Sequence, residues 1–192
     1  MTIDKSNNAS RPTLTKNDWV EAAQQILIKN GIDAVRVDSL AKELNITRGS
    51  FYYHFKSRLE LLENILTHWR TSTTERIILQ LNKVDLSPKE RLKQLLELPF
   101  RGKSATDTAA FEIAIRGWAR RDPLARQAMD EVDRHRLAYI QSLLHQDGRD
   151  EIEAKDTANL IYAYLLSISL VLPEQSKEKR YEQHLRIIQQ WL

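Results

Sequence analysis

A run of hydrogen-bonding and cationic side chains lies near the N-terminus, on a segment that is predicted to be a short helix. Residues 47–58 read TRGSFYYHFKSR. Phe51 and Phe55 are four residues apart, so on a helix they share one face and can anchor it. The other positions carry groups that suit phosphates and base edges, namely Arg48, Ser50, Tyr52, Tyr53, His54, Lys56 and Arg58. The pattern predicts a helix surface that contacts an anionic, hydrogen-bonding partner.

A second short amphipathic segment positions this helix. Residues 37–44, VDSLAKEL, are followed by a turn of three residues at 45–47. Two short helices joined by such a turn form a helix-turn-helix, whose second helix enters the major groove of DNA. Gly49 costs about 1 kcal/mol of helix stability relative to alanine. Its missing side chain would let a DNA backbone come close.

The same residues carry a resemblance to a known family. The run GSFYYHFKS, preceded by LAKELNIT, resembles the DNA-binding domain of the tetracycline-repressor (TetR) family over about residues 16–62. The resemblance implies that Tyr52, His54 and Lys56 contact phosphates or bases, and an arginine at position 48 suits guanine O6 and N7. DNA contacts are therefore predicted for Arg36, Thr47, Arg48, Gly49, Ser50, Tyr52, Tyr53, His54, Lys56 and Arg58. The alternative for the two tyrosines is that they pack against the first helix.

Two positions depart from the family pattern. Arg36 stands where most members have a Ser or Thr cap, so the following helix loses a side-chain cap and gains a cation near the expected phosphate path. Asn45 stands where the family usually has glycine. Because asparagine is the next best residue for a positive φ, we expect the turn to be kept.

Charge and composition favour a DNA-binding class. The chain of 192 residues has a net charge of +3. Residues 1–58 hold nine Lys and Arg against six Asp and Glu, whereas residues 59–192 hold twenty of each. The whole excess therefore lies in the part that carries the helix-turn-helix, as expected of an electrostatic footprint on DNA.

Other classes of protein find little support in the sequence. The chain has no cysteine, which fits a reducing cytosol, and its first residues lack the apolar core of a signal peptide. The longest apolar run, residues 160–172, is too short to span a bilayer. The five histidines show no metal-ligand spacing within one helix, and no phosphate loop or nucleophile motif is present. We therefore expect a cytoplasmic protein with no membrane contact, no cofactor, no metal and no enzymatic activity.

Helical periodicity and the absence of alternating strand patterns predict an all-α fold. We divide the chain into a flexible arm at 1–15, a three-helix DNA-binding domain at 16–58 and a helical effector-binding and dimerisation domain at 59–192. Ser87 to Glu90 form a capping box with proline at the first helical position. Helices are expected at about 16–30, 37–44, 57–81, 123–146, 150–172 and 176–191. Two more are expected from residue 88, with Leu92, Leu95 and Leu96 on one face, and around Phe111, Ile115 and Trp118.

The helix expected at 150–172 is apolar on two faces, so it must be buried on two sides. One side can pack in its own domain and the other against a second copy, with two-fold symmetry. The family resemblance likewise implies that the last two helices of each subunit form a four-helix bundle. The predicted interface residues are Leu160, Ile161, Tyr164, Leu165, Ile168, Leu172 and Ile188. The alternative is a central helix of a monomer.

The resemblance also implies a site for a small-molecule effector in the C-terminal domain. The predicted lining is Trp69, Phe100, Phe111, Ile115, Trp118, Met129 and Tyr139. The alternative for aromatic residues at helical spacing is plain core. The run TSTT at 71–74 either supplies polar groups to this site or faces water. The acidic residues of the neighbouring helices are expected on the solvated surface: Glu112, Asp130, Glu131 and Asp133.

These observations together predict a homodimeric transcriptional regulator that binds palindromic double-stranded DNA. We expect a repressor that is released by an unidentified small molecule. One alternative is a constitutive DNA-binding protein that recruits a protein partner. The other is a helical enzyme or carrier with a basic N-terminal domain.

Overall fold

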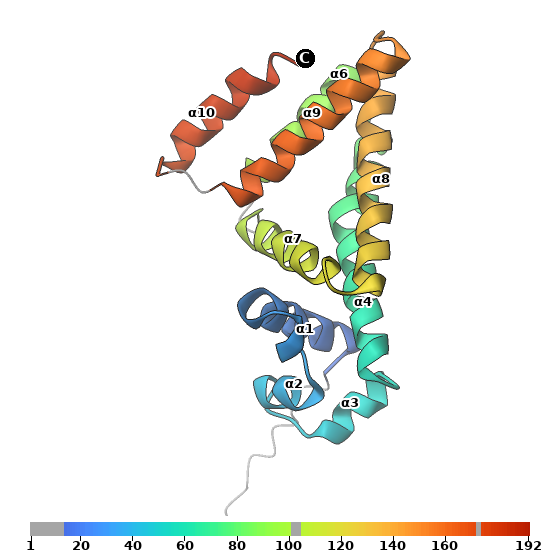
Figure 1. The fold of residues 1–192 in the computed structure, drawn as a ribbon, viewed down its shortest axis with the longest axis vertical. Coiled ribbons are helices and arrows are strands. Elements are labelled where there is room, and N and C mark those ends of the chain that lie inside the picture. Colours follow the sequence, from blue (N-terminus) through green and yellow to red (C-terminus); the bar gives the residue numbers. More distant parts are fainter. Residues whose placement is uncertain (1–13, 101–104, 172–173) are drawn as a thin grey trace, which may run out of the picture.

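The computed structural model describes residues 14–100, 105–171 and 174–192, and these residues form helices with no strand. Figure 1 shows a small group of helices, α1 to α3, at one end and a larger helical bundle at the other, with α4 running between them. The helices are α1 (Lys16–Asn30), α2 (Val37–Glu43), α3 (Arg48–His54), α4 (Arg58–Arg70), α5 (Arg76–Lys83), α6 (Pro88–Glu97), α7 (Ala105–Ala119), α8 (Pro123–Gln146), α9 (Glu151–Leu170) and α10 (Lys177–Ile188).

The all-α prediction is confirmed, and shorter helical turns complete the fold. They are the 3-10 turns η1 (Ile32–Ala34) and η3 (Leu98–Phe100) and the π-helical segment η2 (Thr71–Glu75). Most of the expected N-terminal arm, residues 1–13, lies outside the described residues, as do residues 101–104. No helix among the described residues is long and apolar enough to cross a membrane.

Side-chain caps begin several of these helices. The predicted capping box at Ser87 is confirmed: its hydroxyl accepts from the Glu90 backbone N–H, and the Glu90 carboxylate accepts from the Ser87 N–H at 2.9 Å. Thr15 and Asp18 form an equivalent box at the start of α1. Each box satisfies two N–H groups that a helix end would otherwise leave without a partner.

The two departures from the family pattern have the predicted local effect. Arg36, at the start of α2, makes no side-chain cap, and its Nε instead donates to the carbonyl of Asp33 at 2.8 Å. Asn45 has a φ of 52°, the left-handed conformation that the turn requires. The turn between α2 and α3 is therefore kept without glycine.

An aromatic cluster anchors α3 to the rest of the molecule. Phe51 and Phe55 are fully buried, as predicted, and their rings stack with centroids 5.3 Å apart. Trp19 of α1 meets Phe51 edge-on, also at 5.3 Å. Such pairs add about 0.5–1.5 kcal/mol to the burial of their area. The orientation of α3 is therefore set by its buried face.

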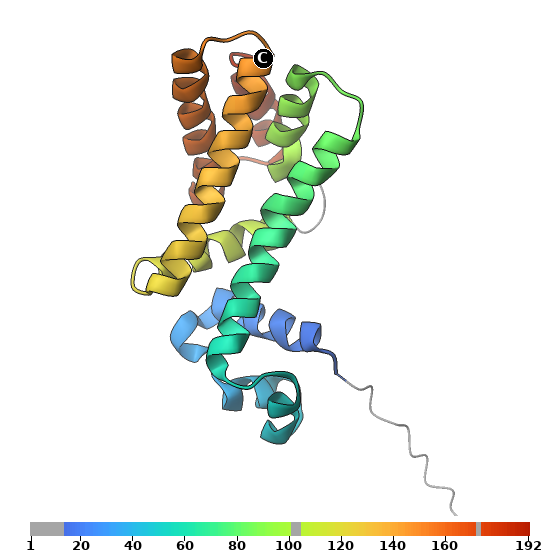
Figure 2. The ribbon, with the colours of Figure 1, turned by 90° about the vertical axis from the view of Figure 1, so that its right-hand side faces the viewer.

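This core continues without a break into the C-terminal part. Trp69 of α4, Ile115 and Trp118 of α7, and Val132 of α8 belong to the same buried cluster as Trp19. A second cluster joins α6, α8, α9 and α10. Figure 2 shows how α4 runs from the α1–α3 group up into the bundle. The core thus crosses the boundary that we drew at residue 58.

The helix that we expected at about 57–81 is a single rod with one irregularity. Its backbone remains helical from α4 to α5, but Thr71–Glu75 adopt a π-helical turn. Within this turn Thr73 Oγ1 donates to the carbonyl of Trp69 at 2.7 Å. Insertion of a side-chain hydroxyl beside a helix carbonyl is one of the usual causes of such a bulge.

Arg58 ties the start of α4 to the turn η1. Its Nε donates to the carbonyl of Val35 at 2.6 Å and its Nη2 to the carbonyl of Ile32 at 2.9 Å. Leu59, near the start of α4, is 56% exposed. The buried face at this end is formed by Leu61, whose side chain belongs to the core shared with α1.

We predict that Arg58→Met lowers the free energy of unfolding by about 1–3 kcal/mol, because two carbonyls lose a charged donor. Lys56→Met is the matched control, since this exposed side chain makes no hydrogen bond among the described residues. Urea denaturation followed by circular dichroism measures both variants. Equal stability of the two variants would show that the Arg58 contacts do not support the fold.

Candidate nucleic-acid interface and ligand cavity

The outer face of α3 presents aromatic and cationic groups to solvent. Tyr52 is 56% exposed and Tyr53 is 84% exposed. Tyr52 meets the buried ring of Phe51 edge-on at 5.2 Å, and Tyr53 meets His54 in the same way at 5.0 Å. Neither tyrosine is buried against α1, so the alternative that we gave for them is wrong. Both remain available to an outside partner.

The cations of this face differ in how firmly the protein holds them. Arg48 pairs with Asp38 of α2, Nε to Oδ1 at 3.1 Å, but their side chains are 62% and 70% exposed. A pair this exposed contributes about 0–1 kcal/mol, so Arg48 can exchange partners at little cost. Arg58 and Arg36, in contrast, donate to backbone carbonyls of their own chain. The structure therefore gives these two arginines a role in the fold.

Thr47 and Gly49 lie at the exposed start of α3. Thr47 occupies the N-cap position, yet its side chain makes no cap hydrogen bond. A Cβ added at Gly49 would meet only Thr47 Oγ1, at an ordinary 3.8 Å. The protein's own packing therefore does not require glycine at this position, and the space beside α3 is open. Ser50 is half-buried on the same helix.

A cavity of about 440 Å³ lies in the C-terminal bundle, between the π-helical segment, α5 to α9 and the start of α10. Of the residues that we predicted for an effector site, Phe100 and Tyr139 line this cavity. The other five belong to the buried core that the bundle shares with α1, namely Trp69, Phe111, Ile115, Trp118 and Met129. Helical spacing indicates that these side chains are buried, but it does not indicate against which neighbour.

Thr73 and Thr74 line the cavity together with aliphatic side chains of α5, α6 and α9. The TSTT run therefore faces the interior with half of its hydroxyls, which decides between the two interpretations of this segment. Leu165 and Ile168 of α9, which we expected at a dimer interface, also line the cavity.

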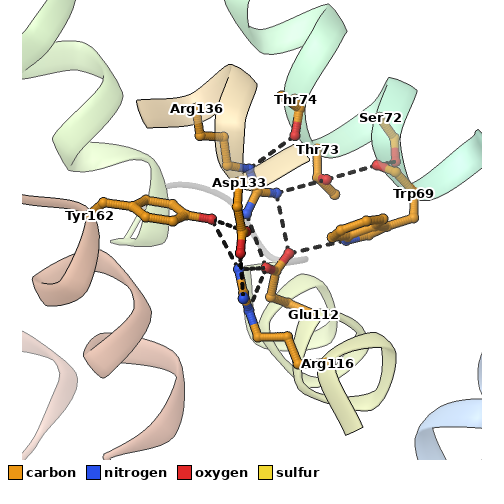
Figure 3. Close-up of polar contacts among 9 residues, drawn as sticks. All are labelled: Trp69, Ser72, Thr73, Thr74, Glu112, Arg116, Asp133, Arg136 and Tyr162. Atoms are coloured by element: carbon orange, nitrogen blue, oxygen red, sulfur yellow. Dashed lines mark hydrogen bonds and ion pairs between the residues drawn. The ribbon is translucent and has the colours of Figure 1, made fainter. Parts of the chain in front are cut away.

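A buried carboxylate joins three helices at one side of this cavity (Figure 3). Glu112 of α7 is 7% exposed. Its carboxylate accepts from Arg116 at 2.8 Å, from both terminal nitrogens of Arg136 at 3.0 and 3.2 Å, and from Trp69 Nε1 at 3.1 Å. The prediction that Glu112 lies on the solvated surface is therefore wrong. Two of its partners, Arg136 and Trp69, are 24 and 43 residues away in the sequence, where spacing gives no signal.

The network extends to α9 and to the π-helical segment. Asp133 accepts from Arg116 at 2.7 Å and from the Tyr162 hydroxyl at 2.5 Å. Arg136 also donates to Thr74 Oγ1 at 3.0 Å and to Thr73 Oγ1 at 3.1 Å. Asp133 is thus a second half-buried carboxylate that we had expected at the surface.

The other two acidic residues form simpler pairs. Asp130 and Arg126 form an exposed ion pair at 2.9 Å. Glu131 pairs with Arg70 at 3.2 Å, and both side chains are about one-third exposed. The surface prediction therefore holds best for Asp130.

Burial and charge set the protonation of this network. Burial alone would lower the pKa of Arg116, but hydrogen bonding to Asp133 and the charge of Glu112 raise it above its ordinary value. Burial alone would also lower the pKa of Arg136, but the charge of Glu112 raises it above its ordinary value. Burial raises the pKa of Tyr162 to about 12. Near pH 7 both arginines are therefore charged and the Tyr162 phenol is neutral.

The faces of α9 separate the residues that we predicted for a dimer interface. Leu160 is 62% exposed, whereas Ile161 and Ile188 are fully buried within the chain. Tyr164 contacts His184 of α10, hydroxyl to Nδ1 at 2.9 Å. Leu172 lies outside the described residues. Ile161 and Ile188 are therefore corrected to core residues of the second cluster. Ile161 points away from Leu160 because successive helix positions are about 100° apart.

The N-terminal helices match those of known regulatory proteins. The family model described as bacterial regulatory proteins, tetR family, matches residues 20–65. Residues 20–65 are therefore similar to the N-terminal domain of that family. The HTH-type transcriptional regulator SrpR of Pseudomonas putida is 31% identical to this chain over 52 residues, which are 27% of this chain and 24% of SrpR. The curated relatives are matched over only 24–39% of their own length.

Solved structures share the fold of nearly the whole chain. A putative transcriptional regulator from Saccharomonospora viridis, in complex with choline, has a TM-score of 0.75 and 19% identity, and the match covers 91% of this chain and 95% of that one. NemR from E. coli, in its reduced form, has a TM-score of 0.71 and 18% identity, with 90% and 95% covered. At these identities the likeness shows the fold of this chain alone.

We predict that Glu112→Gln lowers the free energy of unfolding by about 3 kcal/mol, because two buried guanidinium groups lose their shared carboxylate. Asp130→Asn is the control, since its ion pair with Arg126 is exposed and should contribute well under about 1 kcal/mol. Chemical denaturation of the protein at neutral pH measures both changes. A Glu112→Gln variant as stable as the control would mean that the network is dispensable to the fold.

Proposed function

We propose that this protein is a transcriptional regulator that binds double-stranded DNA as a homodimer and is released from a palindromic operator by a small molecule. The observation that carries the proposal is the exposed face of α3 on its fully buried aromatic anchor. In this division of labour, residues 16–58 contact DNA and residues 59–192 hold the effector and the second copy. A bacterial regulator of transcription works in the cytoplasm, where its operator lies, and this role requires no catalytic step.

The geometry of α3 supports a contact with the major groove. Phe51 and Phe55 fix the buried face of the helix, so the residues on its opposite face point together toward solvent. Arg48 gives up an exposed pair worth about 0–1 kcal/mol for a bidentate contact to guanine worth about 1–3 kcal/mol. Lys56 and the tyrosine hydroxyls then contact phosphates. This exchange of partners by Arg48 favours the DNA-bound protein over the free protein.

An exposed apolar strip on α9 supports the proposed dimer. Leu160 and Leu170 are more than 60% exposed, on a helix whose other face is in the core. Burying large apolar side chains against a second copy removes them from water at about 1.5–3 kcal/mol each. Two-fold symmetry then places two recognition helices about one helical turn of DNA apart, or a multiple of that distance.

The continuous rod of α4, the π-helical segment and α5 supports coupling between the cavity and DNA. One end of the rod is tied by Arg58 to the turn beside α2. The π-helical segment in the middle of the rod supplies Thr73 and Thr74 to the cavity wall. A ligand that prefers one position of this rod would shift the population of DNA-competent dimers. Linkage makes the effect reciprocal, so bound DNA should lower the affinity for the ligand by the same factor.

The first test of this proposal is DNA binding by two variants of α3. Operators are selected from a random duplex pool, and affinity is measured by fluorescence anisotropy over a range of salt concentrations. Lys56→Ala should weaken binding to all duplexes alike. It should also reduce the slope of log affinity against log salt concentration by about one unit. Arg48→Ala should relax the preference at one base pair per half-site, at a cost of about 1–3 kcal/mol.

Two results would count against this assignment. If Arg48→Ala weakened selected and random duplexes equally, Arg48 would not read a base. If selection returned no sequence with two-fold symmetry, the dimeric operator would have to be abandoned, whatever the behaviour of Lys56→Ala.

The dimer is tested by a charge placed on the exposed strip of α9. Leu160→Glu should halve the particle mass measured by light scattering at micromolar concentration, because the new carboxylate would be buried without a partner. The unchanged protein should have about twice the chain mass of 22.4 kDa. Leu79→Glu on α5 is the control, because Leu79 is 54% exposed on a different helix. Dimers of equal mass for both variants would place the interface elsewhere.

A further inference from the structure

Some of the charged side chains that line the cavity have an ion-pair partner among the described residues, and others do not. Among the residues that the structure describes, four of those lining the cavity are charged: Glu112, Arg136, Lys177 and Arg180. Three of these are cations and one is a carboxylate, so this described part of the lining carries an excess of two positive charges. The excess comes from α10, whereas Glu112 and Arg136 come from α7 and α8.

The carboxylate among these groups is already satisfied. Glu112 accepts hydrogen bonds from both Arg116 and Arg136 and from the indole of Trp69. A cationic ligand at Glu112 would have to displace a half-buried guanidinium and leave that charge without a partner, which is unfavourable. The network in Figure 3 is therefore a closed, neutral wall of the cavity.

The cations of α10 are in the opposite situation. Within the part of the chain that the structure describes, neither Lys177 nor Arg180 makes an ion pair with a carboxylate, and Glu178, which follows Lys177, does not line the cavity. Arg180 is half-buried and Lys177 is exposed. These two side chains can approach an anion at the cavity without giving up an existing ion pair.

Most of the remaining lining is apolar. It includes Ile77 and Ile78 of α5, Leu95 of α6 and Leu166 of α9. A cavity of about 440 Å³ lies within the range of small-molecule sites, which are mostly apolar with a few polar groups that fix orientation. Among the described lining residues, the charged groups without an ion-pair partner are the cations Lys177 and Arg180.

We propose that this cavity binds an amphipathic organic acid, with its apolar body between α5, α6 and α9 and its carboxylate at Lys177 and Arg180. The inference rests on the proposed function, because it names the chemical class of the effector that would act there. Charge-assisted hydrogen bonds to a carboxylate are about twice as strong as neutral ones, so the acid group selects the ligand. The apolar body supplies the rest of the affinity.

The test compares three probes that share one alkyl body: octanoate, octan-1-ol and octylamine. Calorimetric titration of the full-length protein at pH 7 should show octanoate binding about tenfold more tightly than the alcohol, a difference of about 1.4 kcal/mol. Octylamine should bind most weakly. The double variant Lys177→Gln and Arg180→Gln should bind acid and alcohol equally.

Lys179→Gln is the matched control for this double variant. Lys179 lies on the same helix, is exposed and does not line the cavity, so this variant should keep the preference for octanoate. Circular dichroism establishes that all variants are folded. Equal binding of acid and alcohol, tightest binding of the amine, no binding of any probe, or loss of the preference in Lys179→Gln would each overturn the proposal.

The outcome is separable from that of the proposed function. The titrations contain no DNA, so a failure of operator binding would remove the regulatory function and leave the ligand class standing. A dimer that binds a palindromic operator but does not prefer octanoate would overturn only the ligand class.

Discussion

The contact on which this structure most depends is the one between the Glu112 carboxylate and two guanidinium groups. Arg116, Arg136 and the indole of Trp69 all donate to this one side chain. Burying a carboxylate is costly, and the cost is offset only when its partners are placed correctly. The contact therefore favours a single arrangement of α4, α7 and α8. Through Asp133 and Tyr162 the same network also reaches α9.

The network lies where two hydrophobic cores approach each other. One core extends from Trp19 and Phe51 at the recognition helix to Val132 of α8, and the other fills the bundle of α6, α8, α9 and α10. Because packed cores respond to strain by discrete rearrangement, a change at the cavity wall need not remain local. The π-helical segment is the piece of the rod that touches both the network and the cavity. This arrangement gives the proposed regulation a physical route.

The charges of the molecule are arranged differently at its two candidate sites. At α3 the cations are exposed, and Arg48 is held only by an exposed pair with Asp38. At the cavity the inner charges are mutually neutralised, and the cations of α10 are not. Exposed cations attract a large polyanion over a distance, with strong dependence on salt. Cations at the edge of an apolar cavity act at short range, so they can select among small molecules.

The sequence alone determined the helices, the turn at Asn45 and the face by which α3 is anchored. These features depend on contacts within about four residues, such as the cap of Ser87 on Glu90 and the stacking of Phe51 on Phe55. The motif of residues 47–58 was readable for the same reason. Local spacing also showed correctly that α9 has two apolar faces.

Only the tertiary structure decided what each buried side chain faces. Periodicity could mark Phe111 as buried, but not that it joins the core shared with α1 and leaves the cavity to other residues. It could not show that Glu112 meets an arginine 24 residues away, or that Leu160 faces solvent while Ile161 faces the core. Such pairings depend on how whole helices cross, and crossing geometry is set by packing among distant segments. The cavity and its charged wall exist only once that packing is complete.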